Sequence, residues 1–337
     1  MRRFENVVGI DVSKSTLSIS FYDGSTHKYY ETSNSVRSFT KDFLKKVKGV
    51  DWSKVLFMME STGVYHLKLA THLSRELGYE VSVANPMSIK KYSDMNLRKA
   101  KTDKSDSKLI AEYGLEYGYK WRFKPKDELY YEIDSRLKAI EDFQSQINRL
   151  NNQIEGFSQL PYEQEEVISC YKDVISAYKS KIKKLEQELE VLLKSRYREE
   201  YELVMSIPGV GMKLASIVLG KLECFRNFKR AKEVVSYIGL CPSIRESGTS
   251  VRGRGHISRR GNAYIRKILF VCSLSAIRYN KFCSNLYRRL LSSGKAKKLA
   301  IIAVANKLIR QIFGVLKNGR PYDPEYLKNL TEVTENG

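Results

Sequence analysis

The chain has 337 residues, with 59 lysines and arginines against 38 aspartates and glutamates and a formal net charge of +21. This length predicts about two domains, and 42% hydrophobic residues exclude global disorder. The best apolar stretch, Leu269–Ile277, is interrupted by serines, so we expect no membrane span. The five cysteines have no CxxC spacing and the N-terminus has no apolar signal core. These features predict a cytoplasmic protein without a disulfide framework or zinc site.

The positive charge is concentrated in the C-terminal part of the chain. Residues 226–320 contain 22 lysines and arginines but only two acidic residues, Glu233 and Glu246. The excess in this segment is nearly the whole net charge. A basic face kept for solubility is one interpretation, but self-repulsion on this scale favours a polyanionic partner, which predicts a nucleic-acid-binding protein.

The first 90 residues alternate between predicted strands and helices. Apolar and β-branched runs predict strands at 7–12, 17–22, 27–32, 55–59 and 80–84, with helices at 39–49 and 64–77. Three strands, a helix and then strand–helix–strand is the order of a ribonuclease-H-like domain. We therefore predict an α/β domain at residues 1–122.

The next segment, residues 127–198, has a helical period. Apolar residues recur there in steps of three and four: Ile168, Tyr171, Ile175, Tyr178, Ile182, Leu185, Leu189 and Leu192. This spacing is typical of a coiled coil, and the break at 156–161 predicts two antiparallel helices. Two interpretations stay open: a helical linker packed on its own chain, or an oligomerisation device.

A second, mainly helical domain is predicted at residues 200–325, followed by a tail at 326–337. Ile207–Gly211 precedes an apolar helix, which is typical of a helix–hairpin–helix element. Gly209 and Gly211 would let backbone N–H groups at a helix start approach a phosphate. A plain turn gives the same pattern.

Four acidic residues are candidates for a metal site. Asp11 and Glu60 end predicted strands that are neighbours in a ribonuclease-H-like sheet, whereas Asp103 and Asp106 share one face of a helix. Converging carboxylates repel one another unless divalent cations neutralise them, and oxygen ligands favour Mg²⁺ or Mn²⁺. Two such ions can hold the attacking and leaving oxygens of a phosphodiester. Taken singly, each acid is as readily a turn or helix-capping residue.

The chain also carries two sets of short motifs. They are Gly9–Lys14, Glu60–Gly63 with Tyr65, Asn85-Pro86 and Lys101–Asp106, and then Ile207–Gly211, Tyr237–Leu240 with Pro242, Glu246–Gly248, Gly261-Asn262 and Arg266. In this order they resemble the DEDD transposases, insertion-sequence recombinases related to Piv-type DNA invertases. Some members of that family are guided by a bridge RNA. The resemblance covers nearly the whole chain.

The resemblance implies a RuvC-like N-terminal domain in which Asp11, Glu60, Asp103 and Asp106 hold Mg²⁺. It further implies that Ser247, in the second domain, attacks DNA and forms a covalent phosphoserine link. The implied partners are the DNA of the element ends and target, a guide RNA, and further copies of the chain in a dimer or tetramer. The implied location is the prokaryotic nucleoid.

Three arginines flank Ser247 in the sequence. Arg245, Arg252 and Arg254 suit phosphate contacts, either to stabilise charge at phosphorus or to bind the DNA backbone. We therefore predict a DNA transposase or site-specific recombinase. The alternatives are a metal-dependent Holliday-junction endonuclease in which water attacks, and a non-catalytic nucleic-acid-binding protein. The 22 tyrosines do not favour a tyrosine recombinase, because no supporting Arg/His constellation accompanies them.

Overall fold

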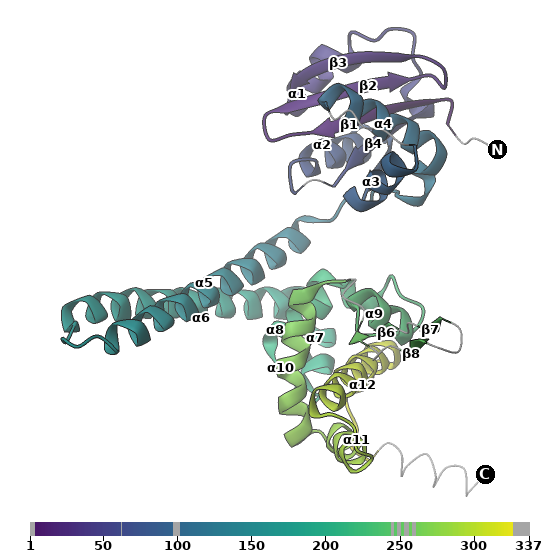
Figure 1. Ribbon diagram of the computed structural model, residues 1–337. Coiled ribbons are helices and arrows are strands. Elements are labelled where there is room, and N and C mark those ends of the chain that lie inside the picture. The colour runs from purple at the N-terminus through teal and green to yellow at the C-terminus, as the bar shows by residue number, and fades with distance from the viewer. Residues whose placement is uncertain are drawn as a thin grey trace, which may run out of the picture. The chain divides into compact units, whose positions relative to one another are not determined.

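The computed structural model describes residues 4–61, 63–96, 102–243, 246–247, 251–252, 256–257 and 261–325. A five-stranded mixed sheet forms the centre of its N-terminal part (Figure 1). The strands are β1 (Asn6–Val12), β2 (Thr16–Tyr22), β3 (His27–Ser33), β4 (Val55–Glu60) and β5 (Glu80–Ala84). Their spatial order is β3-β2-β1-β4-β5, with β1, β2 and β3 antiparallel and β1, β4 and β5 parallel. The prediction of an α/β N-terminal part is confirmed.

The two faces of this sheet pack against different helices. Along β1, Val8, Ile10 and Val12 belong to one core, whereas Val7 belongs to the other, because successive side chains of a strand point to opposite faces. The first core includes residues of α1 (Val36–Phe39), η1 (Thr40–Leu44), α2 (Leu67–Thr71) and η3 (His72–Glu76). The second includes residues of α3 (Pro86–Met95) and α4 (Asp103–Tyr117). The short turns η2 (Trp52–Lys54) and η4 (Gly118–Lys120) precede β4 and follow α4.

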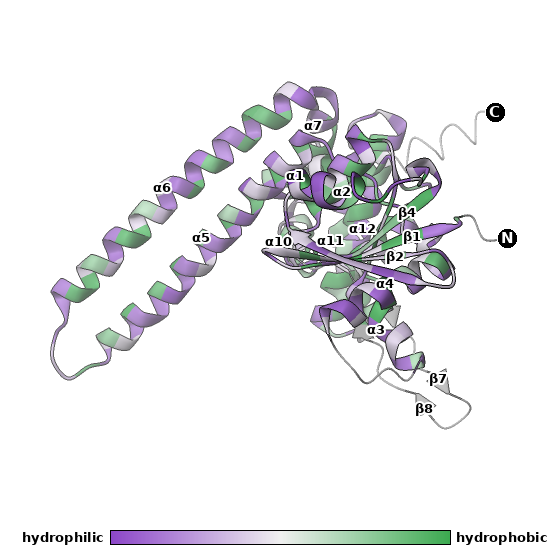
Figure 2. Ribbon diagram, turned by 90° about the horizontal axis from the view of Figure 1, so that it is seen from above, coloured by the Kyte–Doolittle hydropathy of each residue, from purple (hydrophilic) through white to green (hydrophobic). Residues whose placement is uncertain are grey.

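A hairpin of two long helices follows, α5 (Glu128–Ser158) and α6 (Glu165–Arg196). Figure 2 shows hydrophobic residues recurring along both helices between hydrophilic ones. Four buried isoleucines fill the contact between them: Ile140, Ile147, Ile175 and Ile182. The predicted pair of packed helices is therefore present, while supercoiling and a role in oligomerisation stay predictions.

The C-terminal part is mainly helical. Its helices are α7 (Arg198–Met205), α8 (Met212–Ser216), η5 (Ile217–Lys221), η6 (Glu223–Phe225), α9 (Ala231–Ile238), α10 (Ala263–Tyr279), α11 (Lys281–Ser292) and α12 (Lys297–Asn318). Between α9 and α10 lie four two-residue strands that the sequence pattern did not predict: β6 (Pro242–Ser243), β7 (Glu246–Ser247), β8 (Val251–Arg252) and β9 (His256–Ile257).

Helix α12 bears on the expectation of no membrane span, because it is longer than the stretch Leu269–Ile277 that the sequence pattern singled out. Among the described residues, it is the one helix that by length and composition could cross a membrane. Lys307 and Arg310 interrupt its sequence, but the helix collects its apolar side chains on one face. Val304, Leu308 and Ile312 on that face are completely buried in the core, so packing within the chain accounts for its apolar character.

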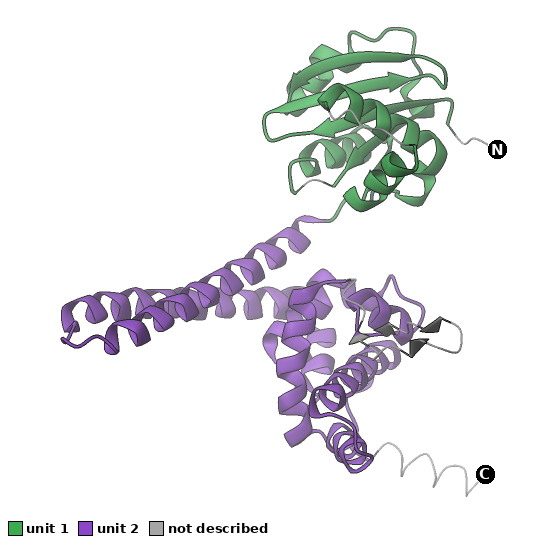
Figure 3. Ribbon diagram, in the orientation of Figure 1, with its two compact units in different colours: residues 1–126 green, residues 127–337 purple. Residues whose placement is uncertain are grey.

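The chain divides into two compact units, residues 1–126 and 127–337 (Figure 3). The first unit contains the sheet and α1–α4. The second contains the helical hairpin as well as α7–α12, because the base of the hairpin belongs to the C-terminal core. Ile133, Leu137, Leu189 and Leu193 of the hairpin are buried there.

Candidate active site

The sheet places Asp11 and Glu60 at neighbouring strand ends. The parallel pairing of β1 and β4 sets Ile10 opposite Met59, so the next residues along the two strands are Asp11 and Glu60. Both lie on the α4 side of the sheet, since they alternate with the side chains that face the opposite core. The expectation that these two residues share one sheet edge is consistent with this register.

Helix α4 carries the other two acids in its first turn. A reciprocal capping box fixes where the helix begins, because the Ser105 N–H donates to Thr102 Oγ1 at 3.1 Å and the Thr102 N–H donates to Ser105 Oγ at 2.9 Å. Asp103 and Asp106 follow this cap directly. Negative side chains here are also favoured by the helix dipole.

Gly9 sets how closely α4 approaches the sheet. A Cβ atom at Gly9 would overlap the backbone nitrogen of Ala111 and the carbonyl oxygen of Ser107, and would lie 2.7 Å from the Ala111 Cα. The helix backbone therefore rests directly on β1, two residues before Asp11. Only glycine permits this contact, and the contact fixes the height of α4 above the sheet.

The electrostatics of Asp11 show that the four acids are neighbours. Burial, and then the negative charges of Asp106, Asp103 and Glu60 in that order of size, together raise the pKa of the half-buried Asp11 carboxyl to about 6. Within the described residues, however, no three His, Cys, Asp or Glu side chains are grouped closely enough to form a metal site as they stand. The negative charges of the other three acids act on Asp11 across space, and the role of the four carboxylates as ligands stays a prediction.

Asn34 joins the loops that follow the two acidic strands. Its Nδ2 atom donates to the carbonyl oxygens of Ser13, at 2.7 Å, and Tyr65, at 3.4 Å. Ser13 lies just after Asp11, and Tyr65 lies in the turn after Glu60. Sequence analysis missed this residue, because no local pattern marks an asparagine that bridges two distant loops.

Ser247 lies in the group of short strands between α9 and α10. β6 pairs with β9, and β7 pairs with β8 so that Ser247 is opposite Val251. Of Ser247 and Arg252 the structure describes the backbone, while Arg245 and Arg254 lie outside the described residues. The acids are in the first unit and Ser247 is in the second.

The ends of this strand group are held together where α9 meets α10. Helix α9 ends at Gly239, whose φ of +83° is left-handed. Gly261 packs so tightly on α9 that a Cβ would lie 2.6 Å from the Ile238 carbonyl oxygen. Arg266 Nη1 donates to that same oxygen at 3.0 Å, and Asn262 caps α10 by accepting from the Tyr264 N–H. Arg266 thus links the two helices, a role that its place in a sequence motif did not reveal.

The two glycines predicted to contact phosphate have other contacts. Gly209 has a φ of +97°, and a Cβ there would lie 2.6 Å from the Ala276 Cα in α10, so close helix packing requires this glycine. The Gly211 N–H bonds the Cys272 thiol and partly offsets the rise that burial causes in the pKa of that thiol. Phosphate contact by Gly209 and Gly211 stays a prediction.

Comparison with known proteins matches both parts of the chain. A DEDD transposase model of IS110 elements matches residues 8–159, which include all four acids, and the model described as Transposase IS116/IS110/IS902 family matches residues 201–288, which include Ser247. The pilin gene-inverting protein of Moraxella lacunata is 29% identical over 322 residues, covering 94% of this chain and 97% of that protein. The transposase for insertion sequence element IS1111A of Coxiella burnetii is 24% identical, over 73% of this chain and 74% of that protein.

These matches define the class of protein as a DNA transposase or recombinase. The chain belongs to the IS116/IS110/IS902 family of transposases. The resemblance inferred from the motifs is thereby confirmed. Because transposases act on DNA, DNA is the partner that the comparisons support.

Proposed function

We propose that this transposase cuts and rejoins DNA strands through a covalent phosphoserine at Ser247, with Mg²⁺ or Mn²⁺ at the acidic tetrad. The observation that carries the proposal is the convergence of three carboxylates, Glu60 of β4 and Asp103 and Asp106 of α4, on Asp11 of β1. Like charges around the half-buried Asp11 destabilise the protein unless they have a cationic partner, so their presence favours a metal-dependent function.

The strand order supports a ribonuclease-H-like, RuvC-like fold for the first unit. A β3-β2-β1 antiparallel meander extended by parallel β4 and β5 places the carboxyl ends of β1 and β4 side by side. An α/β sheet commonly binds its ligand at such an edge. A ribonuclease-H-like fold with an acidic tetrad requires the carboxyl ends of β1 and β4 to be neighbours in this way.

The donor set fits a hard divalent cation, because all four groups offer carboxylate oxygens. When bound, the cation supplies positive charge that stabilises a phosphodiester as negative charge develops on it. Asp11, Glu60, Asp103 and Asp106 would hold it. The tight Gly9 contact holds α4 against β1, and the Thr102 cap fixes where the helix that carries Asp103 and Asp106 begins.

In the proposed reaction, the Ser247 oxygen forms a bond to phosphorus and the phosphodiester bond to the departing DNA strand breaks. The serine proton leaves, and the oxygen of the departing strand is protonated. The phosphoserine ester preserves the bond energy, so a strand oxygen can later attack it and release the serine without ATP. Arg245, Arg252 and Arg254 are suited to bind the phosphate oxygens during both transfers.

We also propose that a structured guide RNA and further copies of the chain take part. Residues 226–320 contain 22 basic residues. This number is suited to contact the phosphates of more nucleic acid than one DNA site provides. The paired helices α5 and α6 are suited to contact a second copy through their exposed sides.

The proposal is tested by incubating the protein with labelled DNA that carries the element ends, the proposed guide RNA and Mg²⁺. The products are then separated on a denaturing gel. Wild type should give a labelled protein–DNA adduct, and Ser247→Ala should give none while still binding DNA. Asp11→Asn should also abolish the adduct. An adduct that persists in Ser247→Ala, or cleavage by wild type without an adduct, would contradict the serine mechanism.

A second candidate is a metal-dependent endonuclease in which water attacks, since the acidic tetrad lies wholly in the first unit. It predicts cleavage of a Holliday junction that survives Ser247→Ala but not Glu60→Gln. If the chain were a non-catalytic nucleic-acid-binding protein, wild type would cleave no DNA. Asp11→Asn and Glu60→Gln would then have no cleavage activity to remove.

A further inference from the structure

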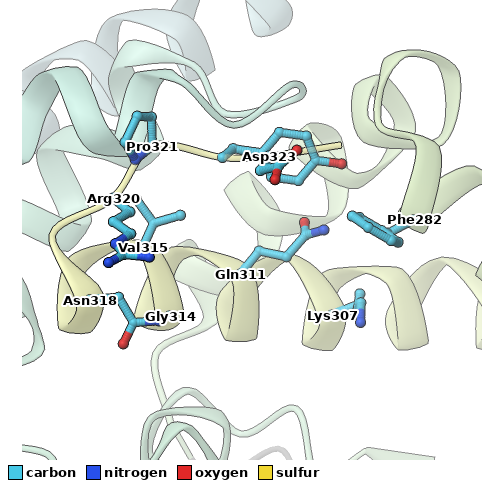
Figure 4. A pocket seen from close by; sticks show the side chains of 10 residues that line it. Phe282, Lys307, Gln311, Gly314, Val315, Asn318, Arg320, Pro321 and Asp323 are labelled. Carbon is cyan, nitrogen blue, oxygen red and sulfur yellow. The ribbon is translucent and has the colours of Figure 1, made fainter. Parts of the chain in front are cut away.

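A groove of about 610 Å³ lies along helix α12 in the second unit, far in the sequence from the acids and Ser247 (Figure 4). Lys307, Gln311 and Gly314 of α12 line its floor, residues 320–323 line one side, and Phe282 at the start of α11 lies toward one end. The established family and the proposed chemistry give this groove no role.

Gly314 leaves the floor of the groove open. It lies inside the helix, where glycine costs about 1 kcal/mol relative to alanine, and a Cβ atom there would meet no atom within 4 Å. No packing contact in the described chain therefore requires a glycine at this position. An open helix backbone is instead suited to the close approach of a flat ligand.

Cationic and aromatic side chains line the same groove. The Lys307 Nζ atom lies 5.8 Å from the centre of the Phe282 ring, and that ring meets the Tyr322 ring edge-on with centres 6.1 Å apart. The exposed Arg320 follows the end of α12. Since an α-helix rises 1.5 Å per residue, the span from residue 307 to residue 318 is about 16 Å, the length of two to three nucleotides.

A buried asparagine fixes the polar groups of the groove. Asn280 is 1% exposed; its side chain donates to Gln311 Oε1 at 3.1 Å and accepts from Gln311 Nε2 at 3.3 Å and from the Tyr322 hydroxyl at 3.0 Å. Gln311 keeps one amide N–H that none of these bonds uses. Asn280 also donates to the Pro208 carbonyl oxygen, which ties the groove to the turn before α8.

We propose that this groove binds a short single-stranded segment of nucleic acid, DNA or RNA. Lys307 and Arg320 contact phosphates two to three nucleotides apart, a base stacks in the aromatic corner formed by Phe282 and Tyr322, and Gln311 and Asp323 bond the edge of a base. A single strand is favoured over a duplex because only an unstacked base exposes its face to a side chain. The site does not depend on the chemistry of Ser247.

The test measures the affinity of fluorescein-labelled octathymidylate and octauridylate by anisotropy, in EDTA, over a series of salt concentrations. Gly314→Leu fills the groove without changing charge and should weaken binding about tenfold, the value of roughly one stacked base. Lys307→Ala/Arg320→Ala should lower the salt slope by about 1.4, since each single-strand phosphate contact contributes about 0.7. A larger effect with one oligonucleotide identifies DNA or RNA as the ligand.

The matched control is Gly314→Ala, which should bind within twofold of wild type and melt at a higher temperature. Ser247→Ala should bind the oligonucleotides as wild type does, so this test is separate from that of the serine mechanism. Unchanged affinity in Gly314→Leu, or an unchanged salt slope in the double variant, would overturn the proposal. Equal weakening of a blunt duplex by Gly314→Leu would overturn the preference for single strands.

Discussion

Gly9 of β1 lies directly beneath Ala111 of α4, so close that a Cβ atom at Gly9 would lie 2.7 Å from the Ala111 Cα. This contact ties the strand that carries Asp11 to the helix that carries Asp103 and Asp106. The geometry of the acidic site is therefore set by a residue without a side chain.

We expect Gly9→Ala to lift α4 from the sheet, because backbone atoms of a helix cannot move aside singly. The free energy of unfolding of the first unit should fall by about 1–3 kcal/mol, as for other overpacked cores. DNA cleavage should fall further than stability alone explains, since Asp103 and Asp106 move with the helix. Urea denaturation and the cleavage assay measure the two effects.

Gly156→Ala in α5 is the control for Gly9→Ala, because a Cβ there meets nothing within 4 Å. It should leave cleavage unchanged and raise helix stability by up to about 1 kcal/mol. Wild-type stability in Gly9→Ala would show that α4 is held less closely than the structure indicates.

The pKa of Asp11 predicts how the metal-free protein responds to pH. The folded-state pKa of about 6 exceeds the ordinary value of 3.8, so the folded protein holds this proton more tightly than the unfolded chain. The resulting stability is present below about pH 4 and is lost as the pH rises through 6. The Tm of Asp11→Asn minus that of wild type, in EDTA, should be small at pH 4 and positive at pH 7, by about 2–4 °C.

Added Mg²⁺ should raise the Tm of wild type at pH 7, because binding to the folded state alone stabilises it. The same addition should change the Tm of Asp11→Asn much less. A Tm difference between the two proteins that does not vary with pH would contradict the convergence of charges on Asp11.

Arg266 is predicted to position the strands that carry Ser247, through its bond to the Ile238 carbonyl oxygen. Arg266→Met should destabilise the second unit by about 1–3 kcal/mol, the cost of losing a hydrogen bond from a charged group. The rate of protein–DNA adduct formation should fall more than tenfold, with DNA affinity changed less than threefold. Arg266→Lys should restore part of the rate.

If Arg266→Met lowered stability but left the adduct rate unchanged, the contact would serve folding alone. DNA affinity and adduct rate falling by equal factors would instead identify Arg266 as a DNA contact. The DNA affinity and the adduct rate are measured on the same labelled DNA, with Ser247→Ala as the control that forms no adduct.

The turn Glu223–Phe225 contains three successive non-glycine residues in the left-handed region, with φ values of +49°, +53° and +61°. Glu223→Gly should relieve strain there, whereas Glu223→Ala removes the same side chain without relieving it. The free energy of unfolding of Glu223→Gly should exceed that of Glu223→Ala by about 1 kcal/mol. Equal values in urea denaturation would show that this turn is not strained.

The sequence by itself determined the properties that depend on neighbouring residues. Apolar and β-branched runs gave the five strands, and steps of three and four gave the long helices α5 and α6, because these patterns follow from local backbone geometry. The positions of Asp11, Glu60, Asp103, Asp106 and Ser247 in motifs also identified the family, which the comparisons confirm.

Only the tertiary structure decided which distant residues meet. Gly9 beneath Ala111, Asn34 between the loops after Asp11 and Glu60, and Arg266 on the Ile238 carbonyl oxygen all join residues that no local period relates. Close packing against Ala276 of α10 likewise requires a glycine at position 209, which its sequence motif did not reveal. Close packing and through-space charge depend on the partner across the fold, and the partner is fixed only when the chain has folded.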